Sequence, residues 1–310
     1  MNAVAKITAA APKSASKLRA VAPKAAEPSK PKVLLYGKPG VGKTWAALDF
    51  PSVYYIDTEG GADLQHYTDK LEKAGGVYLG PEQGSLSFDT VLDQVKALAT
   101  EEHGYRTLVI DSISKLFNTE IADEADRLGD KDVFGASKKP AIAYMRQLVS
   151  WLQRIDMNVV LIAHEKAEWG MVKGQRSEIG GTFDAWDRLG YELHLILHVQ
   201  KNGNTRTAKV GKSRLLGFPE ASTFPWSYSE FAQRYGRDVI EQDSVPIVLA
   251  TPEQIAEVTR LLDIVKLPEG TVEKWFKKAE VDGWSEMQMD ATGKCIASLK
   301  AKLVAMAEAA

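Results

Sequence analysis

The stretch from Tyr36 to Trp45, YGKPGVGKTW, constrains the fold of this chain more than any other feature. Gly37 is followed by four residues and then by Gly42, Lys43 and Thr44, which is the spacing GxxxxGK[ST]. Glycines let backbone N–H groups approach phosphate oxygens without a Cβ clash, and the helix that follows directs its positive end at the same anion. We therefore predict a nucleotide site in which Lys43 reaches the β- and γ-phosphates and Thr44 binds Mg²⁺. The predicted nucleotide-binding residues are Gly37, Lys38, Pro39, Gly40, Val41, Gly42, Lys43, Thr44 and Trp45.

Short apolar segments separated by helical patterns surround this loop. The apolar segments are residues 33–37, 52–57, 107–112 and 158–165, and the helical patterns include residues 90–99 and 141–155. Strands that are buried on both faces, with helices between them, indicate βαβ units and a parallel sheet. The glycine-rich loop follows the first strand and precedes a helix, as a phosphate site requires.

The pattern changes near residue 191. Alternate residues from Tyr191 to Val199 are large and apolar, which predicts a half-exposed strand. Asn202-Gly203 then predicts a type I′ turn into a second strand over residues 205–210. We therefore expect an α/β fold, a P-loop core with a mostly parallel central sheet and an antiparallel hairpin at one edge.

The composition along the chain predicts three units. Residues 1–31 are rich in Ala, Lys, Ser and Pro, so we expect a disordered basic tail. Residues 32–248 form the nucleotide-binding core. In residues 249–310, Thr251 and Gln254 have the spacing of a helix capping box, and three apolar stripes at helical spacing predict a three-helix module.

Charge and cysteine content exclude several classes of protein. The net charge is −2, so affinity for nucleic acid has to come from local patches. The single cysteine, Cys295, excludes an internal disulfide framework and a thiolate zinc site, which fits a reducing cytoplasm. There is no run of about 18 apolar residues, so we expect no membrane partner.

Two carboxylates are placed for chemistry on a nucleotide. Asp111 ends the apolar segment TLVID, which brings it to the edge of the sheet where ligands bind, and we predict that it holds Mg²⁺. The alternative is an Asp that caps the helix after it. Glu59 follows the second strand by two residues, where a carboxylate can polarise the attacking water. Many other P-loop ATPases have the acidic residue that polarises the attacking water directly after the Mg²⁺ carboxylate. In this chain Ser112 follows Asp111 instead.

The ordered segments GKPGVGKT, IDTEGGAD, LVIDSIS and VVLIAHE resemble the RecA-like core of recombinases. They resemble still more closely the compact phage-encoded ATPases that act in single-strand annealing or recombination. The resemblance covers roughly residues 32–230. It implies that Lys43 and Thr44 bind phosphate and Mg²⁺, that Asp111 is the Mg²⁺ carboxylate, and that Glu59 is the catalytic base. A phage-encoded protein would act in the host cytoplasm.

The resemblance also implies further catalytic residues. His164 ends the fourth strand, where recombinases have a glutamine that senses the γ-phosphate, and an imidazole can donate a hydrogen bond there. The alternative is a histidine that caps a strand end. Lys212 and Arg214 resemble the pair of basic residues that, in RecA filaments, reaches the ATP of a neighbouring subunit. The spacing of the two residues differs by one. A solvated basic segment is the alternative.

Residues 165–188 are glycine-rich and polar, and we predict a long functional loop there. In the RecA-like family this loop binds single-stranded DNA. Acidic residues in the same stretch leave a solvated loop as the alternative. The segment 127–141 is a second candidate for DNA contact. The predicted DNA-binding residues of the two segments are Lys138, Lys139, Lys166, Trp169, Lys173 and Arg176.

The resemblance implies an ATP- and Mg²⁺-dependent protein that binds single-stranded DNA and promotes annealing or strand exchange, as a homo-oligomer. The C-terminal module is a candidate contact for a single-strand-binding protein. A helicase loader or translocase, and a nucleotide-gated adaptor that does not hydrolyse ATP, remain open alternatives. A small-molecule kinase usually carries an arginine-rich lid, and no such segment is evident.

Overall fold

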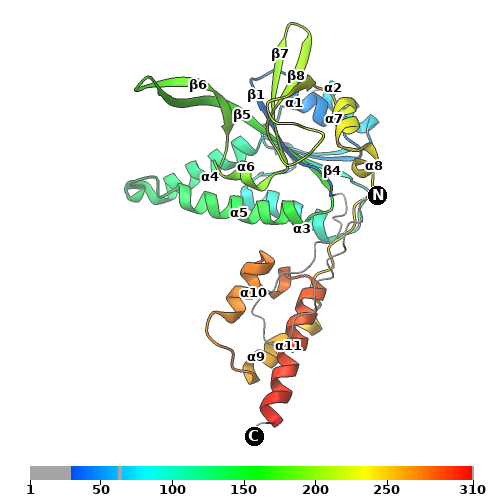
Figure 1. Ribbon diagram of the computed structural model, residues 1–310, viewed down its shortest axis with the longest axis vertical. Helices are drawn as coiled ribbons and strands as arrows, with labels where there is room; N and C mark the ends of the chain where they lie inside the picture. The colour runs from blue at the N-terminus through cyan, green and yellow to red at the C-terminus, as the bar shows by residue number, and fades with distance from the viewer. Residues whose placement is uncertain (1–28, 62–64, 309–310) are drawn as a thin grey trace, which may run out of the picture.

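The computed structural model describes residues 29–61 and 65–308, and shows one sheet with helices on both faces and a group of helices beside it (Figure 1). Residues 1–28 of the predicted basic tail lie outside these residues. Within the described part of the chain, no helix combines the length and hydropathy that a membrane span needs.

The strands confirm the predicted α/β fold. The order across the sheet is β3-β2-β4-β5-β1-β7-β8-β9, and β6 pairs with β5 outside this path. From β3 to β7 neighbouring strands are parallel, whereas β6, β8 and β9 pair antiparallel. The strands are β1 (Lys32–Gly37), β2 (Val53–Asp57), β3 (Val77–Leu79), β4 (Thr107–Asp111), β5 (Asn158–Val172), β6 (Gln175–Asp184), β7 (Leu195–Asn202), β8 (Thr205–Ser213) and β9 (Thr223–Pro225).

Helices cover both faces of the sheet because its central strands are apolar on both sides. In β1, Leu34 packs into the cluster formed with α3, α4 and α5, whereas Val33 and Leu35 pack into the cluster on the opposite face, with α1 and α7. The helices of this unit are α1 (Lys43–Ala47), α2 (Gln65–Lys73), α3 (Phe88–Thr100), α4 (Ile113–Leu128), α5 (Lys138–Arg154), α6 (Leu189–Glu192), α7 (Tyr228–Tyr235) and α8 (Arg237–Ile240).

The first described residues are part of the folded unit. Lys30, within the segment predicted as a tail, is only 4% exposed, and its Nζ donates to the carbonyl oxygens of Gln242 and Asp243, each at 2.8 Å. Lys32 begins β1, and burial lowers its pKa to about 7.

The C-terminal helices are α9 (Pro252–Ile264), α10 (Thr271–Ala279) and α11 (Met289–Glu308). Val258 and Leu261 of α9 and Leu299 of α11 are fully buried and form a cluster of their own. The Thr251 hydroxyl accepts from the backbone N–H of Gln254, and the Gln254 amide oxygen accepts from the N–H of Thr251. These reciprocal bonds are the predicted capping box.

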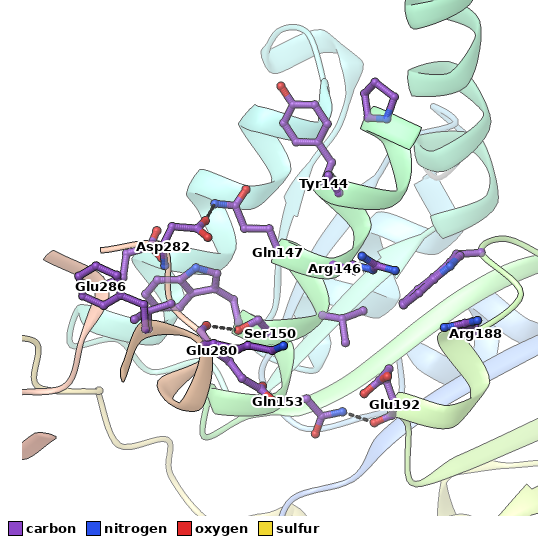
Figure 2. A pocket seen from close by; sticks show the side chains of 18 residues that line it. Tyr144, Arg146, Gln147, Ser150, Gln153, Arg188, Glu192, Glu280, Asp282 and Glu286 are labelled. Atoms are coloured by element: carbon purple, nitrogen blue, oxygen red, sulfur yellow. Dashed lines mark hydrogen bonds between the residues drawn. The ribbon is translucent and has the colours of Figure 1, made fainter. Parts of the chain in front are cut away.

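The C-terminal helices contact the sheet unit through polar groups of α5. Gln147 donates to the Asp282 carboxylate at 2.7 Å, and the Ser150 hydroxyl donates to the Glu280 carbonyl at 2.6 Å. Figure 2 shows these side chains on the wall of a pocket of about 810 Å³ between α5 and the turn that follows α10.

The prediction of a long loop over residues 165–188 is wrong for most of its length. Strand β5 continues beyond the sheet to Val172 and pairs antiparallel with β6, so residues 165–184 form a projecting hairpin, called the arm below (Figure 1). Lys173 and Gly174 have φ angles of 51° and 81°, which is the geometry of a two-residue hairpin turn. Trp169 and Met171 alternate with smaller or polar residues as a strand requires, a pattern that the glycines of the segment obscure.

The predicted hairpin at residues 191–210 needs two corrections. Strand β7 begins only at Leu195, and Tyr191 lies in α6. Asn202 pairs with Thr205, so the two-residue turn is Gly203-Asn204 rather than Asn202-Gly203. Only Gly203 of these two has a positive φ, 58°, and glycine at the first central position is typical of a type II′ turn.

Candidate nucleotide site

The phosphate loop joins β1 to α1 at the carboxyl end of the central strands. Gly37, Gly40 and Gly42 have φ angles of 153°, 74° and 94°, which residue types other than glycine rarely adopt. A Cβ on Gly37 would lie 2.3 Å from the carbonyl oxygen of Val199, so only glycine allows β7 to approach. The loop borders a pocket of about 430 Å³. Its lining includes Lys43, Thr44, Glu59, Asp111 and His164.

Lys43 extends back over the loop. Its Nζ donates to the carbonyl oxygens of Gly37 at 2.8 Å and Lys38 at 3.0 Å. Burial lowers the Lys43 pKa, and the nearby carboxylates of Asp111 and Glu59 oppose this. A partly desolvated ammonium held by a glycine loop fits a phosphate group.

Asp111 and Thr44 form the second part of the site. The Thr44 hydroxyl donates to Asp111 Oδ2 at 2.6 Å, and the Tyr55 hydroxyl donates to the same oxygen at 3.1 Å. Burial raises the Asp111 pKa to about 6, although these two hydrogen bonds act in the opposite direction. A hydroxyl and a carboxylate in contact are oxygen ligands of the kind that Mg²⁺ prefers, so these residues fit that ion.

Asp111 is not the cap of the next helix. The N-cap of α4 is Ser112, whose hydroxyl accepts from the N–H of Lys115 at 3.1 Å. The alternative function considered for Asp111 is therefore carried out by its neighbour.

Glu59, Ser112 and His164 meet beside the loop. Glu59 Oε1 lies 2.5 Å from His164 Nε2, and the Ser112 hydroxyl donates to the same Glu59 oxygen. Strands β2, β4 and β5 are neighbours, so their carboxyl ends bring these three residues together. The side chains of Glu59 and His164 are 37% and 50% exposed, so water reaches both. A carboxylate hydrogen-bonded to an imidazole can accept a proton from water.

Asp57 is a residue of the site that sequence reasoning missed. It pairs with Asp111 across β2 and β4, and its Oδ1 accepts from the N–H groups of Glu59 and Gly60, both at 2.9 Å. These bonds hold the loop that carries Glu59. Asp57 ends the second apolar segment just as Asp111 ends the third, and this shared position could have identified it from the sequence.

The family model described as "AAA domain" matches residues 29–225. The chain belongs to this AAA-domain family. It is a P-loop ATPase by family, which implies ATP and Mg²⁺ as its cofactors. No curated protein matches the chain.

Three of the solved structures that match the chain are similar to it at low identity. The RadB recombinase is 17% identical, with a TM-score of 0.41, and the match covers 65% of this chain and 90% of that one. An ATPase of the type III secretion system of pathogenic bacteria is 11% identical, with a TM-score of 0.36, over 87% of this chain and 79% of that one. The pCW3 conjugation coupling protein TcpA is 13% identical, with a TM-score of 0.33, over 68% and 64%. Likeness at this level supports no statement about activity.

The predicted DNA-binding residues lie on two elements. Trp169 and Arg176 share the arm, with the guanidinium 5.5 Å from the ring centre and the Trp169 side chain exposed. Lys173 lies in the turn of the arm, and Lys166 at its base pairs with Asp184 at 3.4 Å. Lys138 and Lys139 begin α5 instead, so the structure does not place them on the arm.

The remaining predicted site residues lie outside the pocket. Trp45, on α1, is 41% exposed and has the Lys70 ammonium 3.9 Å from its ring centre. Lys212 and Arg214 donate to the carbonyl oxygens of Leu193 and Tyr191. Lys212 pairs with Ile196 near the start of β7, at the edge of the sheet opposite the phosphate loop.

Proposed function

We propose that this protein hydrolyses ATP with Mg²⁺ and uses that activity to bind single-stranded DNA and promote its annealing or strand exchange. One observation carries the hydrolytic part: Glu59, placed next to His164, lies in the same pocket as Lys43 and the Thr44–Asp111 pair. Phosphate ligand, metal ligands and base thus share one cavity.

Each residue has a distinct chemical task. Lys43 and the loop amides hold the phosphates, and Mg²⁺ at Thr44 and Asp111 supplies charge neutralisation when bound. Glu59 orients the attacking water and accepts its proton, while His164 and Ser112 hold the carboxylate in place.

The DNA part rests on the arm. Strand β5 carries both His164 and Trp169, with a shift in its register against β6 between Glu168 and Trp169, so the nucleotide pocket and the arm share one strand. An exposed indole beside a guanidinium is a platform on which bases stack, and no specific sequence is required.

Addition of single-stranded DNA is expected to raise ATP turnover. Trp169→Ala should raise the DNA concentration for half-maximal stimulation by about tenfold, within the range for loss of one stacked base. Leu216→Ala, which removes an exposed side chain outside the arm, is the matched control. ATP turnover that does not change on addition of DNA would contradict the DNA part of the proposal. Strand unwinding would favour a translocase or helicase loader. Binding of ATP without turnover would favour a nucleotide-gated adaptor.

Assembly is the further element of the proposal. Lys212 and Arg214 lie at the edge of the sheet opposite the phosphate loop, so they can reach an ATP only in a second copy of the chain. We infer a homo-oligomer, and the C-terminal helices remain the candidate contact for a single-strand-binding protein.

Replacement of both Lys212 and Arg214 by alanine is expected to lower turnover about 10- to 100-fold, the usual size of coupling between sites. Mixing this variant with Glu59→Gln protein should restore part of the activity, because one mixed interface has both functional groups. Specific activity that is independent of protein concentration, with no recovery on mixing, would mean that one chain holds a complete site.

A further inference from the structure

The hairpin of β7 and β8 lies against the phosphate loop at Arg206. Arg206 is the second residue of β8 and pairs with Lys201 of β7. A Cβ on Gly42 would lie 2.6 Å from Arg206 Nε and 2.8 Å from its Cδ. The arginine side chain therefore occupies the space directly over the backbone of Gly42, which is the residue before Lys43.

Trp226 fixes Arg206 and Gly42 relative to each other. Its indole Nε1 donates to the Gly42 carbonyl oxygen at 3.4 Å, and its backbone N–H donates to the Arg206 carbonyl oxygen at 2.9 Å. The indole is buried and packs edge-on against Phe224 and Phe231. One buried residue thus ties the strand that carries Arg206 to the loop.

The Arg206 guanidinium is exposed, and within residues 29–61 and 65–308 no carboxylate or carbonyl group accepts a hydrogen bond from it. Lys212 and Arg214, further along the chain, differ from Arg206, because both donate to backbone carbonyls. A guanidinium has five N–H donors in a planar fork that matches phosphate oxygens. A free group of this kind beside a phosphate loop is suited to an anionic ligand.

We propose that Arg206 is a nucleotide-binding residue that the same chain supplies to its own site, on the α- and β-phosphate side. This inference rests on the proposed function. The backbone amides of the glycine-rich loop, to which Gly42 belongs, hold the α- and β-phosphates in P-loop proteins. Arg206 does not line the pocket that contains Lys43, Glu59 and His164, where the γ-phosphate and the attacking water belong. Arg206 should therefore affect the binding of ADP and ATP equally and leave the chemical step unchanged.

The test compares two variants of Arg206 in the full chain. Arg206→Gln keeps much of the stem and removes the charge, whereas Arg206→Lys keeps a charge and loses the fork. The dissociation constants of ADP and ATP, measured by calorimetry, should both rise about tenfold to a hundredfold in Arg206→Gln, as for loss of a hydrogen bond to a charged group. Arg206→Lys should bind both nucleotides more tightly than Arg206→Gln does. In Arg206→Gln, the KM for ATP should rise, while kcat at saturating ATP should stay within about twofold of wild type.

Lys209→Ala is the matched control, because it removes a second exposed cation from β8 on the other face of the strand. Its ADP affinity should equal that of wild type. Three results would overturn the proposal: unchanged ADP affinity in Arg206→Gln, an equal loss in Arg206→Gln and Arg206→Lys, or a loss confined to kcat. An equal loss, with a lower melting temperature in the absence of nucleotide, would mean that Arg206 only packs against the loop. Failure of the wild-type protein to bind any nucleotide would instead reject the proposed function.

Discussion

Replacement of Lys43 by alanine is expected to lower kcat/KM for ATP by about 10³-fold, the upper range for loss of one preorganised hydrogen-bond donor. The reason lies in how the ammonium is held. The Gly37 and Lys38 carbonyls fix its position, and burial lowers its pKa, so it is already partly stripped of water before a phosphate arrives. In the Lys43→Ala variant, no fixed cation remains at this position to stabilise the negative charge that develops on the phosphates during hydrolysis.

Steady-state ATP turnover, with phosphate release as the readout, measures this effect. Lys73→Ala is the matched control, because Lys73 is an exposed lysine at the end of α2. The fold of the Lys43→Ala variant should survive, since the side chain lies on the pocket wall outside the apolar clusters. Turnover at the wild-type rate would show that the phosphates bind elsewhere.

The parts of this site that the sequence predicts are those whose geometry is local. The positive φ angles of Gly40 and Gly42 follow from a glycine pattern of fixed spacing. The placement of Asp111 at the same edge of the sheet as Thr44 follows from one further rule, that parallel strands end at the same edge of a sheet.

Contacts that depend on strand order were beyond the sequence. Glu59 and His164 are 105 residues apart, and they touch only because β4 alone separates β2 from β5. No local pattern specifies that order. Arg206 was missed for a similar reason, because a single arginine in a strand carries no signal until the hairpin is placed on Gly42.

The arm shows a conflict between two local signals. Its glycines and charged residues are typical of loops, whereas the alternation at Trp169 and Met171 and the Lys173-Gly174 turn are typical of a hairpin. The backbone hydrogen bonds between β5 and β6 decide the outcome, because each strand satisfies the polar backbone groups of the other. An isolated hairpin is of marginal stability, and here β5 is anchored in the sheet by β1 and β4.

Glu59→Gln is the variant expected to separate binding from hydrolysis. The amide keeps the size of the carboxylate but cannot accept a proton, so kcat should fall about 10³-fold, within the range for general base catalysis. ATP affinity should change little, because Lys43, the loop amides and the Thr44–Asp111 pair are untouched. A single-turnover measurement with prebound ATP reports the chemical step, and equilibrium binding reports the affinity.

Glu165 is the other glutamate that lines the pocket, and it pairs with His198 at 3.0 Å. Normal hydrolysis by Glu59→Gln, together with loss of hydrolysis in Glu165→Gln, would move the base to Glu165.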